Sequence, residues 1–290
     1  MPVDLTAATD FMATHAKVLD RRRLALVLAG GDPAGALAAL DGHRNPDGGY
    51  GWGLEGDLRS TESQPGAAGH AFELFAEIAP HTAPQAIALC DWLQTITLPS
   101  GAIPMAVPMD TTAGSGPWWG GADPAEPSLQ ITAFVAQFAH RAARHDEQLA
   151  AHPWLAGATA YCLDAIDALT ASPPAYVLLF CVNLLDALGD EARLAKLGAW
   201  IPADGRMPVA GGSEHEALTP LQLAPDPDSL ARALLDAAVV EADLDRLAAG
   251  QQDDGGWTVD FASRSPIGRL EWRGYATVAA IRTLRANGRL

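Results

Sequence analysis

The chain has little cysteine, a low charge density and no surplus of positive charge. Each of these features excludes some classes of protein. Only 19% of its 290 residues are charged, below the quarter that is usual in soluble domains. Hydrophobic residues make up 49%, which is ample for a packed core and argues against disorder. Acidic residues outnumber basic ones by 35 to 19, so the formal charge of −16 repels polyanions, and we expect no nucleic-acid binding.

The three cysteines, Cys90, Cys162 and Cys181, lie far apart in apolar helical surroundings. An odd and scattered count argues against a disulfide framework and against a CxxC metal site. We therefore interpret them as reduced core residues and expect neither a metal nor a cofactor.

Targeting and membrane signals are also missing. Residues 1–5 lack the basic and apolar regions of a signal peptide. The longest apolar stretch, residues 175–188, is interrupted by Asn183 and Asp186 and is too short to span a bilayer. These features predict a soluble, cytoplasmic protein without an integral membrane segment.

Helical spacing runs through the chain, and Ala and Leu dominate it, so we predict an all-α protein. A weak internal repeat surrounds four loop glycines, each preceded by a leucine eight residues earlier and by another apolar residue eleven residues earlier. This spacing of three marks one buried face of a helix that ends just before the glycine. The glycines are Gly48, Gly101, Gly205 and Gly255, and the leucines are Leu40, Leu93, Leu197 and Leu247.

A second helix is expected after each loop, and several of these begin with proline, which the first helical turn tolerates. An opening pair at residues 5–18 and 20–29 adds a sixth unit. We place the other second helices near residues 64–78, 127–144, 173–188, 228–238 and 272–286.

Six helix pairs of about fifty residues fit a closed ring, in which no terminal repeat needs a cap. We predict one domain, residues 1–290, with an (α/α)6 toroid fold, a double ring of helix pairs with Gly-rich loops at one end. The first helices would form the outer wall and the second helices would line the inside. Because helix N-termini carry partial positive charge and free N–H groups, the mouth at the loop end is suited to an anion.

Two loops carry a family resemblance. Residues 251–257 match the core Q-x-x-x-G-x-W of the QW motif of squalene and hopene cyclases, with Leu247 at its aliphatic position and Arg246 where an aromatic is expected. Residues 47–53, Asp-Gly-Gly-Tyr-Gly-Trp-Gly, look like the loops of protein prenyltransferase β-subunits. The chain therefore resembles the prenyltransferase and squalene-cyclase repeat superfamily. The resemblance implies an α/α toroid in which the Gln and Trp of such loops tie neighbouring helices together.

The activity signatures of that superfamily are missing from this sequence. The D-x-D-D tetrad of class II terpene cyclases does not occur, and Asp253 and Asp254 lie in the QW-like loop instead. No cysteine has an aspartate two residues before it, as zinc-binding prenyltransferases require, and the C-H-G and W-C-x-G contexts of lanthionine-forming toroids are missing too. The resemblance thus implies a fold rather than a reaction.

Residues 50–65 carry the densest mixture of aromatic and charged side chains, and they lead from an outer helix to the mouth. Glu55 and Asp57 are candidate catalytic residues, and the neighbouring candidates for substrate binding are Tyr50, Trp52, Arg59 and Gln64. An apolar ligand with a polar head fits such a mixture. The alternative is a solvated loop in which Ser60, Thr61 or Ser63 caps the next helix.

Residues 271–275 open the last inner helix and lie beside the first unit if the ring closes. Glu271 is the third candidate catalytic residue, and Trp272, Arg273 and Tyr275 are candidates for substrate binding. Trp272 and Tyr275 share one helix face, which either lines a cavity or packs against another helix.

Two other segments have open interpretations. Trp118 and Trp119 stand in a Gly-rich loop and either cover a pocket as substrate-binding residues or anchor the loop. Residues 21–23, three arginines, either hold an anion at the mouth or form a solvated basic turn, and the sequence favours the turn.

Three functions remain open. The first is a terpene-cyclase-like or prenyltransferase-like protein that binds an isoprenoid or other small hydrophobic molecule, with acid-initiated cyclisation by Asp57, Glu55 or Glu271 and cation–π stabilisation by aromatic side chains. The second is a non-catalytic binding protein for a hydrophobic ligand or a partner. The third is a carbohydrate-active toroid with paired carboxylates and platforms at Trp52 and Trp272.

Overall fold

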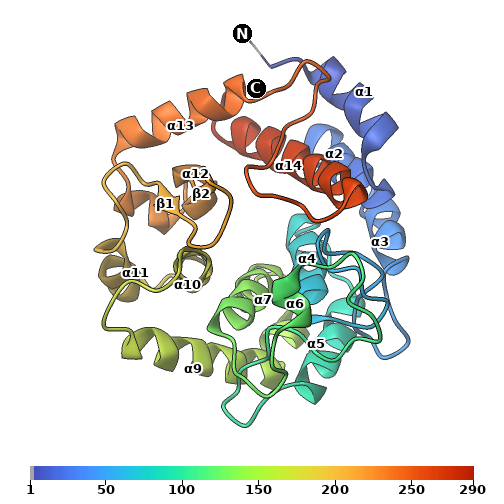
Figure 1. Ribbon diagram of the computed structural model, residues 1–290, viewed down its shortest axis with the longest axis vertical. Coiled ribbons are helices and arrows are strands. Elements are labelled where there is room, and N and C mark those ends of the chain that lie inside the picture. The colour runs from blue at the N-terminus through green and yellow to red at the C-terminus, as the bar shows by residue number, and fades with distance from the viewer. Residues whose placement is uncertain (1–2) are drawn as a thin grey trace.

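The computed structural model describes residues 3–290 and is mostly helical, with 56% of the chain in helix and 3% in strand. The predicted all-α class is confirmed. Figure 1 shows one set of helices around the periphery and a second set nearer the middle. The peripheral helices are α1 (Leu5–His15), α3 (Pro33–Asp41), α5 (Gln85–Thr95), α9 (Pro153–Ala168), α11 (Glu191–Gly198) and α13 (Ala237–Ala249). The inner helices are α2 (Val18–Ala29), α4 (Pro65–Glu77), α7 (Leu129–Ala143), α10 (Ala175–Leu188), α12 (Pro220–Leu223) and α14 (Pro266–Ala286).

The remaining elements are short. They are α6 (Pro117–Gly120), α8 (Glu147–Ala150), the 3-10 helix η1 (Leu230–Leu234) and a two-stranded antiparallel hairpin of β1 (Met207–Pro208) and β2 (Ala217–Leu218). Side-chain caps fix where several long helices begin, because an aspartate or serine accepts a hydrogen bond from a free N–H of the first turn. Asp4 caps α1, Ser128 caps α7, Asp236 caps α13 and Ser265 caps α14.

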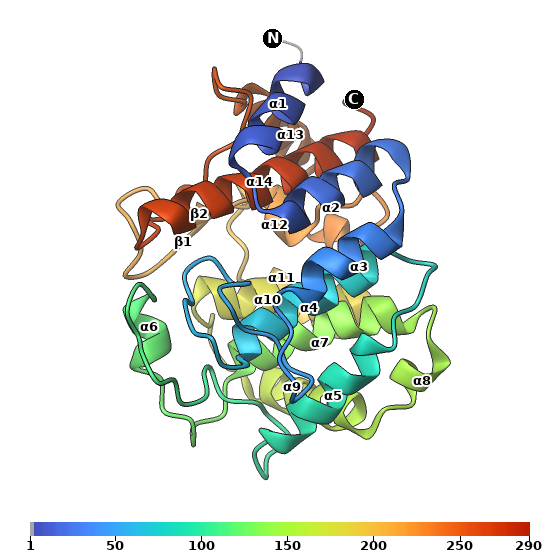
Figure 2. The same cartoon turned by 90° about the vertical axis from the view of Figure 1, so that its right-hand side faces the viewer.

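Consecutive helices pack against one another, and the last helices return to the first. The helix α4 packs on α5 and α7, α7 packs on α9 and α10, and α10 packs on α11 and α12. Further along, α12 packs on α13, α13 packs on α14, and α14 packs on both α1 and α2. Figure 2, turned by 90°, shows α14 and α2 side by side. The two ends of the chain are therefore joined through their helices.

The repeated loop glycines lie where the backbone of one loop meets the next helix. All four have a positive φ, between 66° and 92°. A Cβ at Gly48 would lie 2.7 Å from the Ala88 carbonyl oxygen in α5, and one at Gly101 would lie 2.9 Å from that of Gly157 in α9. A Cβ at Gly255 would collide with the Ala7 backbone in α1, whereas Gly205 faces Pro220 at the start of α12. The loop after α13 therefore contacts the peripheral helix α1, as the loops of Gly48 and Gly101 contact the peripheral helices α5 and α9.

The loop of residues 251–257 holds three helices together through hydrogen bonds. The Gln251 amide donates to the Asp4 carbonyl and accepts from the Asp4 N–H, both at 2.8 Å. The Trp257 indole donates to the Leu247 carbonyl at 2.7 Å, and its backbone N–H donates to the Thr277 hydroxyl at 3.0 Å. These contacts connect the end of α13 to the start of α1 and to α14.

One predicted helix is wrong. Residues 228–238 do not form an inner helix: they hold η1 and the Asp236 cap of the peripheral helix α13. The inner position is taken by α12, a single turn that ends at Leu223 because Pro225 and Pro227 lack the N–H groups needed to extend it. In addition, α14 begins at Pro266 rather than near residue 272.

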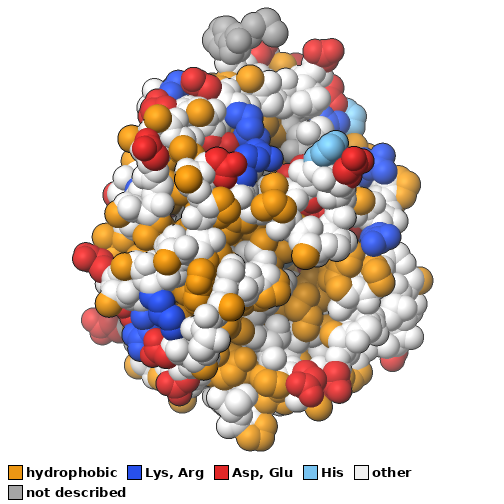
Figure 3. All heavy atoms as spheres, turned by 60° about the vertical axis from the view of Figure 1, so that its left-hand side comes forward, with side chains coloured by type: hydrophobic (Ala, Val, Ile, Leu, Met, Phe, Trp, Pro, Cys, Tyr) orange, Lys and Arg blue, Asp and Glu red, His pale blue; other side chains and the backbone are white. Residues whose placement is uncertain are grey.

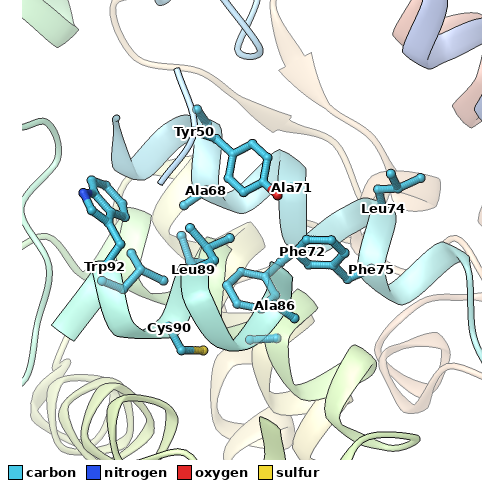
Figure 4. Packing of buried hydrophobic residues seen from close by; sticks show 14 of the residues in the cluster. Tyr50, Ala68, Ala71, Phe72, Leu74, Phe75, Ala86, Leu89, Cys90 and Trp92 are labelled. Carbon is cyan, nitrogen blue, oxygen red and sulfur yellow. The ribbon is translucent and has the colours of Figure 1, made fainter. Parts of the chain in front are cut away.

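The core next to the candidate site lies between α4 and α5. Tyr50, Phe72 and Leu89 are fully buried, and Phe72 and Phe75 meet edge to face with ring centroids 5.7 Å apart (Figure 4). Burial of each such side chain contributes about 1.5–3 kcal/mol. This packing makes the first two turns of α4 a rigid support for the side chains on its other face.

Candidate functional site

A small cavity lies where α2, α4 and α14 meet the loop that precedes α4. Its volume is about 20 Å³, which is room for about one water molecule. The cavity is lined by Lys17, Leu19, Asp20, Arg23, Leu54, Gly56, His70, Glu271, Trp272 and Tyr275. Segments more than 200 residues apart in the sequence thus share one site.

Asp57 connects the first loop to the start of α14. Its carboxylate accepts hydrogen bonds from the Trp272 indole at 2.8 Å, the Ser263 hydroxyl at 2.9 Å and the Arg264 backbone N–H at 3.1 Å. Three donors on one buried carboxylate hold the loop in place, and Asp57 itself is 3% exposed.

Glu271 lies between two cations. Arg59 donates to both of its oxygens, at 2.6 and 3.1 Å, and the Lys17 ammonium is 3.3 Å away. Lys17 also donates to the carbonyls of Gly53 and Leu54, at 2.8 and 3.0 Å. The loop, the start of α2 and the start of α14 are therefore held together by one charge cluster.

His70 is the central side chain of the site. Its Nε2 lies 2.7 Å from Glu55 and its Nδ1 lies 3.3 Å from Glu73. Burial by itself lowers the pKa of His70, but the hydrogen bonds that its ring donates to Glu55 and Glu73 outweigh it and raise the pKa to about 9. At neutral pH the ring is therefore an imidazolium with both N–H groups directed at carboxylates.

Aromatic rings surround this imidazolium. The rings of Trp272, Tyr275 and Phe134 meet the His70 ring edge to face, with centroids 5.9, 5.5 and 5.4 Å away. The His70 ring thus packs among three aromatic side chains, and 12% of its side chain is exposed.

A second layer of charge lies behind His70. The Arg23 guanidinium donates to Glu73 at 2.7 Å and to both oxygens of Glu77, and it lies 5.1 Å over the Tyr275 ring. The Tyr275 hydroxyl lies 3.1 Å from Glu73. Burial raises the pKa of Glu73, but Arg23 and His70 outweigh it and hold the pKa at about 2.

The pKa of Asp20 shifts in the opposite direction from that of Glu73. It lines the cavity and lies 3.3 Å from Arg23, yet burial raises its pKa because Arg23 and Lys17 offset the desolvation only in part. Of these groups, His70 is the one whose pKa of about 9 keeps a proton on it at neutral pH.

The structure brings together six of the residues that the sequence singled out: Glu55, Asp57, Arg59, Glu271, Trp272 and Tyr275. Several others lie elsewhere. Tyr50 is buried in the core against Phe75, and the Gln64 amide bridges the backbone of Val107, so both support the fold. Arg273 faces away from the cavity and pairs with Asp254 in the QW-like loop.

The three remaining tryptophans among the candidate site residues differ in exposure. Trp119 is 7% exposed, and its ring lies against Gly66 at the start of α4. Trp52 and Trp118 are 55% and 43% exposed, and the Arg264 guanidinium lies 5.4 Å over the Trp118 ring. Trp119 therefore anchors its loop, whereas Trp52 and Trp118 present apolar surface to solvent.

The sequence did not single out His70, Glu73 or Asp20, and it favoured a solvated turn for the segment that contains Arg23. Arg23 is instead 5% exposed. One signal was present: His70 and Glu73 are three residues apart in a helix that is otherwise apolar up to Glu77 at its end, and charged side chains in such a position are stable only when paired.

No family model matches the chain, and no curated protein is significantly similar to it. Among the described helices, none combines the length and apolarity that crossing a membrane requires. Within residues 3–290 no three His, Cys, Asp or Glu side chains are grouped so that they could hold a metal ion.

Proposed function

We propose that the chain is an (α/α)6 toroid related to the prenyltransferase and squalene-cyclase repeat superfamily. Three observations support this: the alternation of peripheral and inner helices, the contact of α14 with both α1 and α2, and the equivalent packing of Gly48, Gly101 and Gly255. The hydrogen bonds of Gln251 and Trp257 correspond to the role that QW-type loops imply.

We further propose that the loop end of this ring binds a small hydrophobic molecule, with isoprenoids as the substrate class. The observation that carries the proposal is the His70 imidazolium enclosed by aromatic rings. Aromatic faces stabilise a carbocation by cation–π attraction, and the rings of Trp272, Tyr275 and Phe134 lie within 6 Å of the His70 ring.

Apolar surface around the site supports the same ligand class. Trp52, Trp118, Ile267 and Leu270 are exposed on the loops and on the first turns of α14. Figure 3 shows many hydrophobic side chains at the surface of one face of the molecule. Because exposed apolar surface is costly in water, it favours a hydrophobic ligand at this end.

The catalytic step that fits the geometry begins at His70. Glu55, Asp57 and Glu271 already accept hydrogen bonds from His70, Trp272 and Arg59, so none of them is placed as the acid. His70 would donate its Nε2 proton to an oxygen at the polar end of the substrate after that oxygen has replaced Glu55 as the acceptor. The C–O bond then breaks with its electron pair on oxygen, and Trp272 and Tyr275 face the cation that remains. Because the cavity is only about 20 Å³, the ion pair of Arg59 and Glu271 would have to separate before a substrate could enter.

A non-catalytic hydrophobic-ligand protein is the second candidate, favoured by the complete pairing of the predicted carboxylates. The carbohydrate-active alternative has less support, because it needs two carboxylates free to act on a sugar.

The experiment is incubation of purified protein with oxidosqualene and with farnesyl and geranylgeranyl diphosphates, with and without magnesium. We expect turnover of one of them that falls at least tenfold in His70→Gln and is unchanged in His215→Gln, an exposed loop histidine. Saturable binding without turnover supports the second candidate. Neither binding nor turnover by the folded protein contradicts both.

A further inference from the structure

A second and much larger cavity lies at the opposite ends of the same inner helices. Its volume is about 510 Å³, within the range of about 300–1,000 Å³ that small-molecule sites occupy. It is formed by the last turns of α4, α7 and α10, by residues 226–230 and by Arg282 of α14. We call it the far-end cavity.

Three arginines face this cavity from two helices. Arg141 and Arg144 come from α7 and Arg282 comes from α14. Arg141 donates to Asp186 at 3.4 Å, and Arg144 donates to the Ala187 carbonyl at 3.1 Å. Arg282 is half-buried, and its guanidinium makes no hydrogen bond or ion pair with any part of the chain that the structure describes. Its donors remain available to a ligand.

Five carboxylates also line the cavity, those of Glu73, Glu77, Asp186, Asp226 and Asp228, and two of them pair with Arg141 but none with Arg282 among the described residues. Glu73 and Glu77 are held by Arg23, and Asp186 already accepts from the Ser229 hydroxyl and the Ala231 N–H. Asp226 lies 4.0 Å from Arg141 with 35% of its side chain exposed, so solvent screens it.

The guanidinium groups also repel one another. Burial lowers the pKa of Arg141, Asp186 and Asp226 offset this in part, and Arg282 and Arg144 lower it further by smaller amounts. An oxyanion bound between Arg141 and Arg282 would relieve this repulsion, and the planar guanidinium fork matches the geometry of phosphate and carboxylate oxygens.

Apolar groups complete the site. Phe138, Ala76 and Leu188 line the same cavity, so a ligand can place its carbon part against them while its oxyanion meets the arginines. We propose that the far-end cavity binds a small molecule that carries a phosphate or carboxylate group, held by Arg282 and Arg141. This site does not depend on the function proposed for the loop end.

The test is isothermal titration calorimetry at low salt with three probes: inorganic phosphate, pyrophosphate and succinate. The first two represent a phosphate ligand and the third a carboxylate ligand. We expect saturable one-to-one binding of at least one probe, and at least tenfold weaker binding in Arg282→Ala. Arg206→Ala removes the same charge from an exposed loop and should bind like the wild type.

A second variant fills the cavity without changing charge. Ala187→Phe places a ring among the lining residues and should abolish binding, while His70→Gln at the other end should leave it unchanged. Circular dichroism and melting curves confirm that each variant is folded. The proposal is overturned if no probe binds saturably, or if Arg282→Ala or Ala187→Phe binds as tightly as the wild type.

Discussion

The charged residues at the two ends of α4 and α14 differ in whether they are paired. At the loop end the cavity holds about one water, and Arg23, His70 and Glu73 are paired and buried. At the far end the cavity is about 510 Å³, and Arg282 has no partner among residues 3–290.

The comparison separates charged residues that stabilise the fold from the charged residue that we propose binds a ligand. A buried ion destabilises the fold by several kcal/mol unless it is paired, so removal of one partner at the loop end should strongly lower the free energy of unfolding. A half-solvated arginine without a partner contributes little to folding, so its removal should affect binding alone. The following predictions test this division.

Arg23→Met should cause the largest loss of stability. It leaves Glu73, Glu77 and Asp20 as buried carboxyls without their shared cation, and we expect the free energy of unfolding to fall by about 3–5 kcal/mol. Arg282→Met, the matched change at the far end, should alter it by less than about 0.5 kcal/mol. Urea denaturation measures both variants. Equal losses would remove the distinction between the two ends.

The pH dependence of stability should show the loop-end network. Hydrogen bonds to Glu55 and Glu73 raise the pKa of His70 from 6.5 to about 9 in the folded chain, so the folded state binds more protons than the unfolded state between these values. This contribution is fully present below about pH 6.5. It is lost as the pH rises through about 9.

Denaturation curves between pH 6 and pH 9.5 measure the effect. The wild type should lose stability over this range, and His70→Gln should lose less because glutamine does not titrate. If both proteins show the same slope, His70 does not hold its proton through this network. At acid pH, Glu73, whose pKa is lowered to about 2, keeps its contribution above about pH 4.5 and loses it as the pH falls through about 2.

Trp272→Phe should have an intermediate effect. Phenylalanine keeps the ring against His70 but removes the indole N–H that donates to Asp57, and we expect a loss of about 1–2 kcal/mol. Trp118→Phe changes an exposed ring that makes no hydrogen bond within residues 3–290, and the free energy of unfolding should stay within about 0.5 kcal/mol of the wild type. Thermal melts of both variants provide the measurement, and a smaller loss in Trp272→Phe than in Trp118→Phe would contradict the role assigned to Asp57.

The sequence predicted those features that local geometry imposes. Gly48, Gly101 and Gly255 repeat because a Cβ at each would meet the backbone of a neighbouring helix, and this constraint is visible without coordinates. Asp57 and Trp272 could be placed together because the expected ring closure makes residues 50–65 and 271–275 neighbours. The contact itself confirms that neighbourhood.

The features that the sequence did not predict depend on tertiary pairing. Arg23 is one of three adjacent arginines, and only its contacts with Glu73 and Glu77, about fifty residues away, distinguish it from a solvated turn. The expected helix at residues 228–238 failed because Asp236 caps the next helix and Ser229 caps a short 3-10 turn. The two caps therefore begin two separate helical segments within residues 228–238.

Arg59→Ala should produce the smallest change at the loop end. Its pair with Glu271 is partly exposed, and Lys17 remains within 3.3 Å of Glu271 after the substitution, so the free energy of unfolding should fall by about 1 kcal/mol or less. Because salt screens such pairs, the difference from the wild type should shrink between 0.05 and 0.5 M NaCl. Arg144→Ala at the far end removes an exposed side chain that contacts the Ala187 carbonyl and should show no such salt-dependent difference. A loss as large as that of Arg23→Met would mean that the pair of Arg59 and Glu271 belongs to the buried network, and opening it for a substrate would then be too costly for the proposed reaction.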